Sequence, residues 1–300
     1  MFFGTPRYWI GWVAGGLCAV TVMGFEPSEP VVFPRVPDRS VFEERAAPPP
    51  AQGEVDRRAP AEPDFPAPVP GQRGAVPAGF EGPTPDSVAD LAAMEAHVMA
   101  LVRQVTPSVV AVRVGGSTGS GVVISADGWV LTAAHVAASP NRPVRFLFPD
   151  GRTVRGRTLG TNHRMDAGLA RIEEDGDWPW VPVGEAGSGV LGEWVLGLGH
   201  PGGFDPDRSM VVRLGRVIRR TAMALQTDSI LSGGDSGGPL FDMHGRVVGI
   251  HSRISNSTAE NYHVPIDAYL EDWVRLIRGE NWGQDDPAIG RRATGGGGSR

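Results

Sequence analysis

The pattern of apolar and polar positions predicts a mostly β domain that begins and ends with a helix. From Val109 onward, short runs rich in β-branched residues are separated by turn signals such as Ala126-Asp127-Gly128. Many short strands at this spacing are typical of a β-sandwich or a pair of β-barrels, and periodicity alone does not choose between them. The expected strands cover residues 109–114, 121–125, 129–132, 144–148, 153–160, 168–173, 194–198, 210–219, 224–227, 239–242, 246–252 and 262–265.

Two segments carry the period of an amphipathic helix. The first follows Ser87, whose side chain suits an N-cap, and keeps apolar residues at helical spacing until Thr106-Pro107. The second is Ile266–Arg278, where apolar residues again recur every three or four positions. We therefore expect a folded domain at residues 87–278, with one helix at its start and another at its end.

The N-terminal apolar segment points to export. Residues 9–25 carry no charge, and their length is at the short end of the ~17–25 residues that span a bilayer. Residues 1–25 fit both a cleaved signal peptide and an uncleaved inner-membrane anchor, and both place the domain outside the cytoplasm, in the periplasm or secreted. The only cysteine, Cys18, lies in this segment, so we expect no disulfide in the domain.

Composition separates the remaining segments and excludes one class of partner. The 27 prolines of the chain concentrate in residues 26–86, where large aliphatic side chains are few. Such a segment cannot bury enough apolar surface to offset its ordering entropy, so we expect a disordered, extended linker there. A disordered tail is expected at 279–300. The formal net charge is −6 and no basic run is present, which argues against nucleic-acid binding.

Three separated segments carry the parts of a nucleophilic site. Ser236 lies in the run Gly233-Gly234-Asp235-Ser236-Gly237-Gly238, where glycines let backbone N–H groups form a cradle for an anion. A serine hydroxyl is a weak nucleophile and needs a base, for which His135 is suited. Asp166 would hold the imidazole tautomer and stabilise its charged form. Histidine, aspartate and serine in this order predict a Ser-His-Asp triad.

These segments closely resemble the trypsin-like serine proteases, and the domain is similar to the HtrA/Deg-type bacterial branch. Leu131-Thr132-Ala133-Ala134-His135, Met165-Asp166-Ala167 and the serine loop carry the resemblance, together with Gly119-Ser120-Gly121-Val122-Val123. It extends over roughly Leu91 to Ile277. It implies two six-stranded β-barrels with the active site between them, and an oxyanion hole formed by the amides of Gly234 and Ser236. HtrA-like proteins usually carry a PDZ module, which we do not expect here.

The same resemblance suggests a specificity pocket. Ile230 lies six residues before Ser236, where trypsin-like enzymes keep an acidic residue, and an aliphatic side chain cannot pair with Lys or Arg. Gly249, Ile250, His251 and Ser252 would form the pocket wall and the edge that pairs with the substrate backbone. We expect a preference for small or medium aliphatic P1 residues. Recognition of an acidic P1 residue by His251 is the alternative.

Asp235 departs from the HtrA pattern, which usually has asparagine before the serine. In the digestive enzymes this aspartate pairs with a new N-terminus after zymogen cleavage, but no similar activation site precedes Val109. A buried carboxylate without a partner is costly. We therefore expect Asp235 to pair with another cation, an arginine, or to accept backbone hydrogen bonds.

The functional hypothesis is a serine endopeptidase that hydrolyses polypeptide substrates through an acyl-enzyme, in extracytoplasmic quality control or regulated proteolysis. It needs no cofactor and no metal. A catalytically silent protease-like binding module is the alternative, and a chaperone activity independent of Ser236 is a third possibility. The serine loop also matches the α/β-hydrolase elbow, but no βα alternation precedes it. HtrA-like proteases often form trimers, so a homotrimer is an open expectation.

Overall fold

The structure is a computed structural model that describes residues 75–82, 84–205, 210–254 and 260–284. The predicted signal peptide or anchor at 1–25, most of the predicted linker and most of the predicted tail lie outside the described residues. Among the described residues, no helix combines the length and the apolar character that crossing a bilayer requires.

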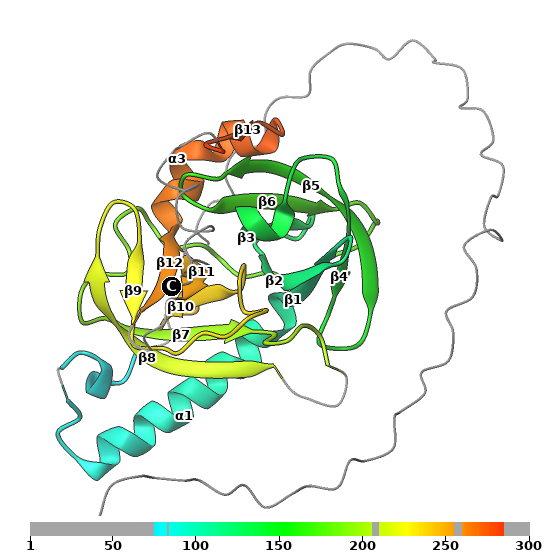
Figure 1. Cartoon of the computed structure of the whole chain (residues 1–300). Helices are drawn as coiled ribbons and strands as arrows, with labels where there is room; N and C mark the ends of the chain where they lie inside the picture. Colours follow the sequence, from blue (N-terminus) through cyan, green and yellow to red (C-terminus); the bar gives the residue numbers. More distant parts are fainter. Residues whose placement is uncertain (1–74, 83, 206–209, 255–259, 285–300) are drawn as a thin grey trace, which may run out of the picture. The chain divides into compact units, whose positions relative to one another are not determined.

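The first half of the domain is a closed, six-stranded antiparallel barrel (Figure 1). Neighbouring strands pair in the order β4-β1-β2-β3-β6-β5, and the pairing of β5 with β4 and β6 closes the barrel. Inward-facing valines and Phe146 fill its interior. The strands are β1 (Val109–Val114), β2 (Ser117–Val123), β3 (Trp129–Ala133), β4 (Pro143–Leu147), β5 (Thr153–Asn162) and β6 (Ala167–Ile172).

The second half is a closed barrel with strand order β10-β11-β12-β9-β8-β7. Its interior holds Val195, Val217, Leu225, Leu240 and Val248. The all-β prediction with two six-stranded barrels and a helix at each end is therefore confirmed. The strands are β7 (Trp194–Gly199), β8 (Val211–Arg220), β9 (Leu225–Thr227), β10 (Pro239–Asp242), β11 (Val247–Ile254) and β12 (Asn261–Pro265).

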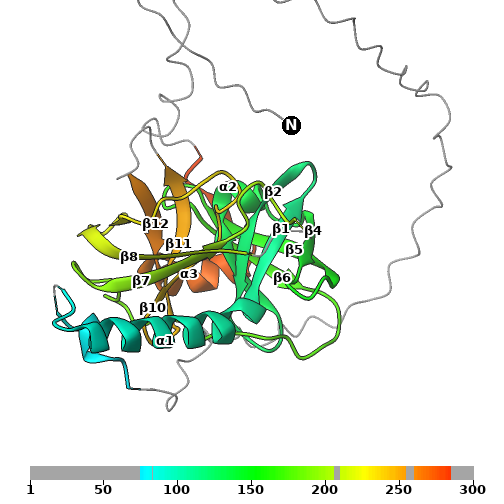
Figure 2. The same cartoon turned by 90° about the horizontal axis from the view of Figure 1, so that it is seen from below.

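The helices attach to the outside of the barrels, as the two views in Figures 1 and 2 show. Helix α1 (Val88–Val105) begins at Ser87, whose side chain accepts a hydrogen bond from the Asp90 amide, as an N-cap does. It packs near the β10–β11 turn, where Leu101 lies against Gly245. Helix α3 (Ile266–Ile277) places buried Tyr269 between the barrels, and its hydroxyl donates to the Thr132 carbonyl at 2.6 Å.

One apolar cluster joins both barrels and both helices. It includes Leu131 from the first barrel, Ile250 from the second, Leu101 from α1 and Trp273 from α3. The barrels therefore share a packed core, which fixes the relative position of loops from either side. This matters because the candidate side chains come from both barrels.

The structure corrects the edges of the predicted linker and tail. Residues 78–80, placed in the linker, form a short 3-10 helix (η2), because Phe80 is buried with an exposed fraction of only 8%. In the predicted tail, Asn281–Trp282 form β13, which pairs in parallel with β5. The guanidinium of Arg275 lies over the Trp282 ring at 3.8 Å and helps to hold it.

Candidate active site

His135 lies in α2 (Ala134–Ala137), a single helical turn that directly follows β3. The imidazole is half exposed, with 50% of its side chain accessible. Its Nδ1 lies 2.9 Å from Oδ2 and 3.0 Å from Oδ1 of Asp166, and its backbone N–H donates to the same carboxylate. The aspartate therefore fixes both the ring and the backbone of the histidine, and Nε2 forms no hydrogen bond to any residue that the structure describes.

Asp166 holds this position through an uncommon backbone conformation. Its φ is +66°, which costs energy for a residue other than glycine. The Asp166 carbonyl accepts from the Ala134 amide at 2.9 Å, and the next residues pair with β3. Gly168 is required in this strand, because a Cβ there would lie 2.8 Å from the Ala133 carbonyl oxygen. The close approach of β6 to β3 brings Asp166 beside His135.

Ser252, at the end of β11, links the aspartate to the serine loop. Its hydroxyl donates to Oδ2 of Asp166 at 2.6 Å, and its carbonyl accepts from the Ser236 hydroxyl at 3.3 Å. Sequence reasoning placed Ser252 only at the substrate edge and missed its contact with Asp166. The two partners are 86 residues apart in sequence, so no local pattern indicates the pair.

The three predicted triad residues thus converge on one site, with one contact still open. Within the described part of the chain, the Ser236 hydroxyl forms no hydrogen bond to His135 and instead faces the Ser252 carbonyl. Catalytic hydrogen bonds are often long or misaligned before substrate binds. A rotation about the Ser236 Cα–Cβ bond is enough to redirect the hydroxyl.

The amides of Gly234 and Ser236 point away from the protein's own acceptors. In a trans peptide the N–H and the C=O point in opposite directions. The Gly233 carbonyl, which shares a peptide with the Gly234 amide, accepts from the Gly202 amide at 2.7 Å. The Asp235 carbonyl, which shares a peptide with the Ser236 amide, accepts from the Gly238 amide at 2.8 Å. Neither the Gly234 nor the Ser236 amide donates a hydrogen bond to any residue that the structure describes. This arrangement suits two donors aimed at an external anion.

Ser120 on β2 anchors the serine loop from the first barrel, a role that sequence reasoning missed. Its hydroxyl donates to the Gly234 carbonyl at 2.9 Å, and its amide donates to the Ser236 carbonyl at 2.8 Å. Glycine at 119 permits this approach, since a Cβ there would lie 2.9 Å from the Ser236 carbonyl oxygen. The Gly119-Ser120-Gly121 sequence was the only signal for it.

Asp235 is fully buried and pairs with an arginine, as expected. Oδ2 lies 2.7 Å from Nη2 of Arg213 on β8, and it also accepts from the Ser232 amide at 2.8 Å. Sequence reasoning expected such a cation and did not identify it. The sequence shows only that Arg213 is a charged residue between Val212 and Leu214 in a predicted strand. In the structure Arg213 is partly buried, whereas its two apolar neighbours are exposed.

The predicted pocket residues separate into two groups. Ile230 has an exposed fraction of 57% and can be reached from solvent. Gly249, Ile250 and His251 are buried inside β11, where their backbones pair with β10 and β12. In this structure these three residues present no surface to a substrate, whereas Ser252 borders the triad, so their role in recognition stays a prediction.

His251 belongs to a buried polar chain. Its Nδ1 lies 2.9 Å from Nδ1 of His263, whose Nε2 lies 2.8 Å from the Thr227 hydroxyl. Burial lowers the pKa of His263 to about 3, and burial, followed by the neighbouring His263 and Arg213, lowers the pKa of His251 well below its usual value. Both rings are neutral at ordinary pH. This role is structural and does not require an acidic substrate.

His135 behaves differently, because its neighbour is a carboxylate. Desolvation lowers its pKa, but the hydrogen bond to Asp166 and the negative charge of that group outweigh this effect and raise it. The ring is therefore a stronger base than an isolated histidine. This is the property that a proton acceptor for a serine hydroxyl needs.

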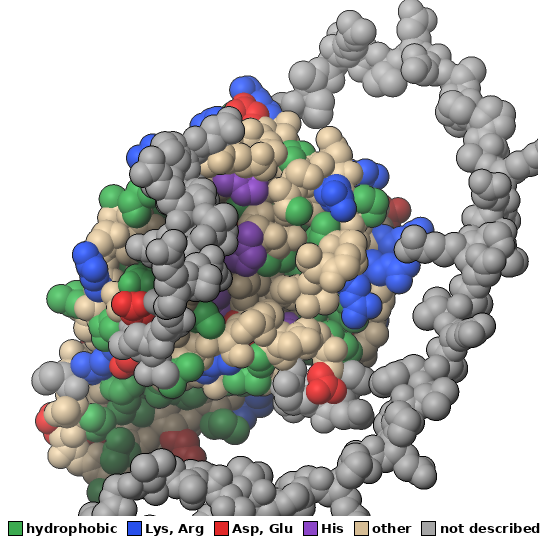
Figure 3. Space-filling model, viewed as in Figure 1, with side chains coloured by type: hydrophobic (Ala, Val, Ile, Leu, Met, Phe, Trp, Pro, Cys, Tyr) green, Lys and Arg blue, Asp and Glu red, His purple; other side chains and the backbone are tan. Residues whose placement is uncertain are grey.

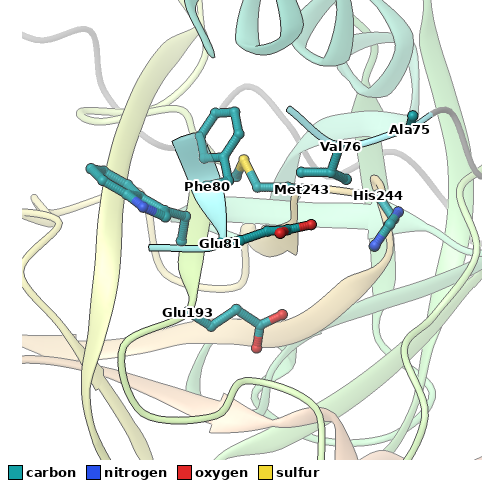
Figure 4. A pocket seen from close by; sticks show the side chains of 8 residues that line it. Ala75, Val76, Phe80, Glu81, Glu193, Met243 and His244 are labelled. Carbon is teal, nitrogen blue, oxygen red and sulfur yellow. The ribbon is translucent and has the colours of Figure 1, made fainter. Parts of the chain in front are cut away.

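Two other features of the surface bear on the assignment of the site. A pocket of about 370 Å³ lies between residues 75–81 and the second barrel, lined by Phe80, Glu193, Met243 and His244 among others (Figure 4). No triad residue lines it. Figure 3 shows histidine side chains near the middle of the face seen in Figure 1. Among the described residues, no three His, Cys, Asp or Glu gather as metal ligands.

Comparison with known proteins agrees with this geometry. The trypsin-like peptidase domain family matches residues 119–250. A probable periplasmic serine endoprotease DegP-like from Pseudomonas putida (strain GB-1) is 36% identical over 167 residues, which are 53% of this chain and 35% of the relative. A protein with the same description from Hahella chejuensis is 34% identical over 163 residues, 52% of this chain and 34% of the relative. The chain thus spans about a third of the length of these curated relatives.

Solved structures give the same result. An HtrA-type protease, AlgW with tripeptide, superposes with a TM-score of 0.53 at 25% identity, covering 60% of this chain and 63% of that one. A serine endoprotease from Yersinia pestis gives a TM-score of 0.52 at 25% identity, with coverages of 59% and 65%. Two closed barrels with a Ser-His-Asp arrangement between them define a double-barrel serine protease fold. By these matches, the chain contains a domain that is similar to the trypsin-like peptidases and to HtrA/Deg-type serine proteases.

Proposed function

We propose that this protein is a serine endopeptidase that cleaves polypeptides with His135, Asp166 and Ser236. The observation that carries the proposal is the position of Asp166, which contacts His135 at 2.9 Å and Ser252 at 2.6 Å. Ser252 in turn contacts the Ser236 hydroxyl. One carboxylate thus organises both the base and the surroundings of the nucleophile.

The chemistry follows from these positions. His135 Nε2 removes the proton from the Ser236 hydroxyl as Oγ attacks the peptide carbonyl carbon. The amides of Gly234 and Ser236 receive the negative charge that develops on the carbonyl oxygen, and losing one such donor commonly costs about 2.7–4 kcal/mol. The imidazolium returns the proton to the departing amine, which leaves an acyl-enzyme. Water, activated by the same histidine, then releases the second product.

Substrate choice is the less constrained part of the proposal. Ile230 carries no charge where a trypsin-like pocket would hold an acid, so small or medium aliphatic P1 residues are favoured over Lys and Arg. The curated relatives are named periplasmic, and residues 1–25 fit an export signal or an anchor. We infer an extracytoplasmic protease acting in protein quality control or in regulated proteolysis.

One observation favours the alternative of a silent binding module, namely that the Ser236 hydroxyl faces Ser252 rather than His135. Labelling with a fluorophosphonate decides between the two. We expect the folded protein to be labelled at Ser236 and to hydrolyse casein, and Ser236→Ala to do neither while keeping the same melting temperature. Folded protein that is labelled no faster than Ser236→Ala would exclude the peptidase.

A further inference from the structure

Three arginines stand side by side on the outer surface of the first barrel. Arg113 on β1 lies directly opposite Arg145 on β4, which in turn lies directly opposite Arg155 on β5. All three residues are exposed, and together they are called the arginine row below. Side chains directly opposite one another on a sheet are about 5 Å apart at Cβ, so like charges in this arrangement destabilise the sheet. The sheet therefore carries the arginine row at a cost to its stability, which a bound anion would relieve.

The carboxylates near the arginine row neutralise only part of its charge. Among the described residues, its first two members form no ion pair, whereas Arg155 pairs with Glu174 at 3.1 Å. Arg157, the next outward residue of β5, pairs with Glu173 at 2.8 Å. Both pairs are exposed and contribute little to stability, so a ligand can displace them. The row and Arg157 line a hollow of about 500 Å³, and Figure 3 shows basic side chains gathered over the first barrel.

The arginine row begins beside the candidate active site. Arg113 faces Thr118 of β2 in register, and Thr118 shares a face of that strand with Ser120 because side chains alternate. The Ser120 hydroxyl donates to the Gly234 carbonyl of the serine loop at 2.9 Å. Two residues of a strand span about 7 Å, so the row starts a short distance from the serine loop and continues away from it across β4 and β5.

A bound polypeptide reaches the arginine row with the part that follows the scissile bond. Ile230, which follows β9, and the β11 edge at Ser252 both belong to the second barrel. We expect these to hold the residues before the bond, so the residues after it leave across the first barrel. Since an extended chain advances about 3.3 Å per residue, a stretch roughly four to eight residues after the bond lies over the row.

We propose that the arginine row is an exosite that binds an acidic stretch of the polypeptide substrate on the leaving-group side of the scissile bond. The proposal rests on the proposed function and adds to it a class of substrate. Guanidinium groups bind carboxylates through charge-assisted, often paired hydrogen bonds. A flat row of exposed guanidinium groups suits an extended chain that carries several carboxylates. The row lies outside the triad and the oxyanion hole, so it adds affinity without changing the chemical step.

The first test uses two fluorogenic peptides that share one cleavage sequence. They differ only in a stretch of Glu or of Gln, placed after the scissile bond where it lies over the arginine row. We expect the Glu peptide to have a KM about tenfold lower at low salt and the same kcat, because the added interaction is equal in ground and transition states. The difference should fall below about twofold in 1 M NaCl, where the Debye length is ~3 Å.

Two matched double variants test the row itself. Arg113→Glu with Arg145→Glu reverses two of its charges. Arg103→Glu with Arg219→Glu makes the same change in net charge at exposed positions on α1 and β8. We expect the first variant to lose the preference for Glu and the second to keep it, while both cleave a peptide without the Glu stretch at the wild-type rate. If the first variant does not fold, Arg113→Gln with Arg145→Gln replaces it. This pair should not lower the melting temperature, because it removes a repulsion.

The outcomes distinguish this proposal from the proposed function. A folded wild type that fluorophosphonate does not label overturns the peptidase, and binding of the Glu peptide to Ser236→Ala, measured by fluorescence anisotropy, still reports on the row. An active wild type without a preference for Glu overturns the exosite alone. A preference that survives Arg113→Glu with Arg145→Glu, or that the control variant loses equally, does the same. Vesicles containing phosphatidylglycerol test the other anionic partner. Vesicle binding that depends on the row, with no effect of Glu on hydrolysis, overturns the proposal in favour of a membrane surface.

Discussion

The hydroxyl of Ser252 donates to Oδ2 of Asp166 at 2.6 Å, across the boundary between the two barrels. The same carboxylate also accepts a hydrogen bond from the backbone N–H of His135 and lies within hydrogen-bond distance of Nδ1 of its ring. The aspartate is therefore held by both halves of the molecule, and its orientation depends on their shared core.

Replacing Ser252 tests this contact. Ser252→Ala removes a hydrogen bond to a charged group, worth about 1.5–3 kcal/mol, and should lower kcat roughly 10- to 100-fold. KM should change much less, because the hydroxyl is occupied by Asp166. Steady-state peptide hydrolysis measures both. Ser188→Ala, which removes a hydroxyl from an exposed turn, is the control and should leave the rate unchanged.

The pH dependence of acylation follows from the raised pKa of His135. Only the neutral ring accepts a proton, so the labelling rate should fall as pH decreases through a midpoint above 6.5. Asp166→Asn removes the interactions that raise the pKa, and burial then shifts the midpoint below 6.5, with kcat lower by about 10⁴-fold. Fluorophosphonate labelling rates across the pH range give the midpoints. A midpoint that Asp166→Asn leaves in place would contradict the assignment.

Two adjacent glycines, Gly233 and Gly234, provide a matched pair of variants at the proposed oxyanion hole. Gly234 has a φ of +97°, and a Cβ there would lie 2.5 Å from the His200 carbonyl oxygen. Gly233 has no atom within 4 Å of such a Cβ. We expect Gly234→Ala to lower kcat by about 10²–10³-fold and to reduce stability, and Gly233→Ala to do neither. Equal effects at both positions would argue against the proposed hole.

The buried histidines should make the fold sensitive to acid. The pKa of His263 is lowered to about 3 in the folded state, against about 6.5 when unfolded. The unfolded chain therefore binds the extra proton first, and this contribution to stability, complete above pH ~6.5, declines as pH falls toward 3. His263→Gln should reduce the slope of unfolding free energy against pH by up to about 1.4 kcal/mol per pH unit between pH 6 and pH 4.

The specificity assignment makes an equally direct prediction. Ile230→Asp places a carboxylate at the expected base of the pocket and should raise cleavage after Arg or Lys at least about tenfold relative to aliphatic P1 residues. Val274→Asp, an exposed position on α3, is the control. Peptide-library profiling measures the P1 preference of the wild type and of both variants. A wild-type preference for Arg or Lys would overturn the assignment of Ile230.

Local patterns predicted most of the individual strands and helices, whereas the choice of two barrels came from the family resemblance. The strands β1 and β10 coincide with the predicted runs 109–114 and 239–242, and both helices begin within a few residues of the expected positions. Strand β2 starts at Ser117, earlier than predicted, because its first residues are polar or glycine and are held by pairing with β1. Phe80 and Trp282 were missed for a similar reason, since isolated aromatics in polar segments give no periodic signal.

The sequence by itself predicted which residues would carry the chemistry, because His135, Asp166 and Ser236 lie in motifs whose residue types and order are typical of a Ser-His-Asp triad. It also determined that Asp235 needed a partner, since a buried carboxylate cannot stay unpaired. Only the tertiary structure decided that the partner is Arg213, that Ser252 holds Asp166 and that Ser120 holds the serine loop. Those choices depend on which strands become neighbours when the barrels close, and polar pairing between distant segments leaves no trace in local hydrophobic periodicity.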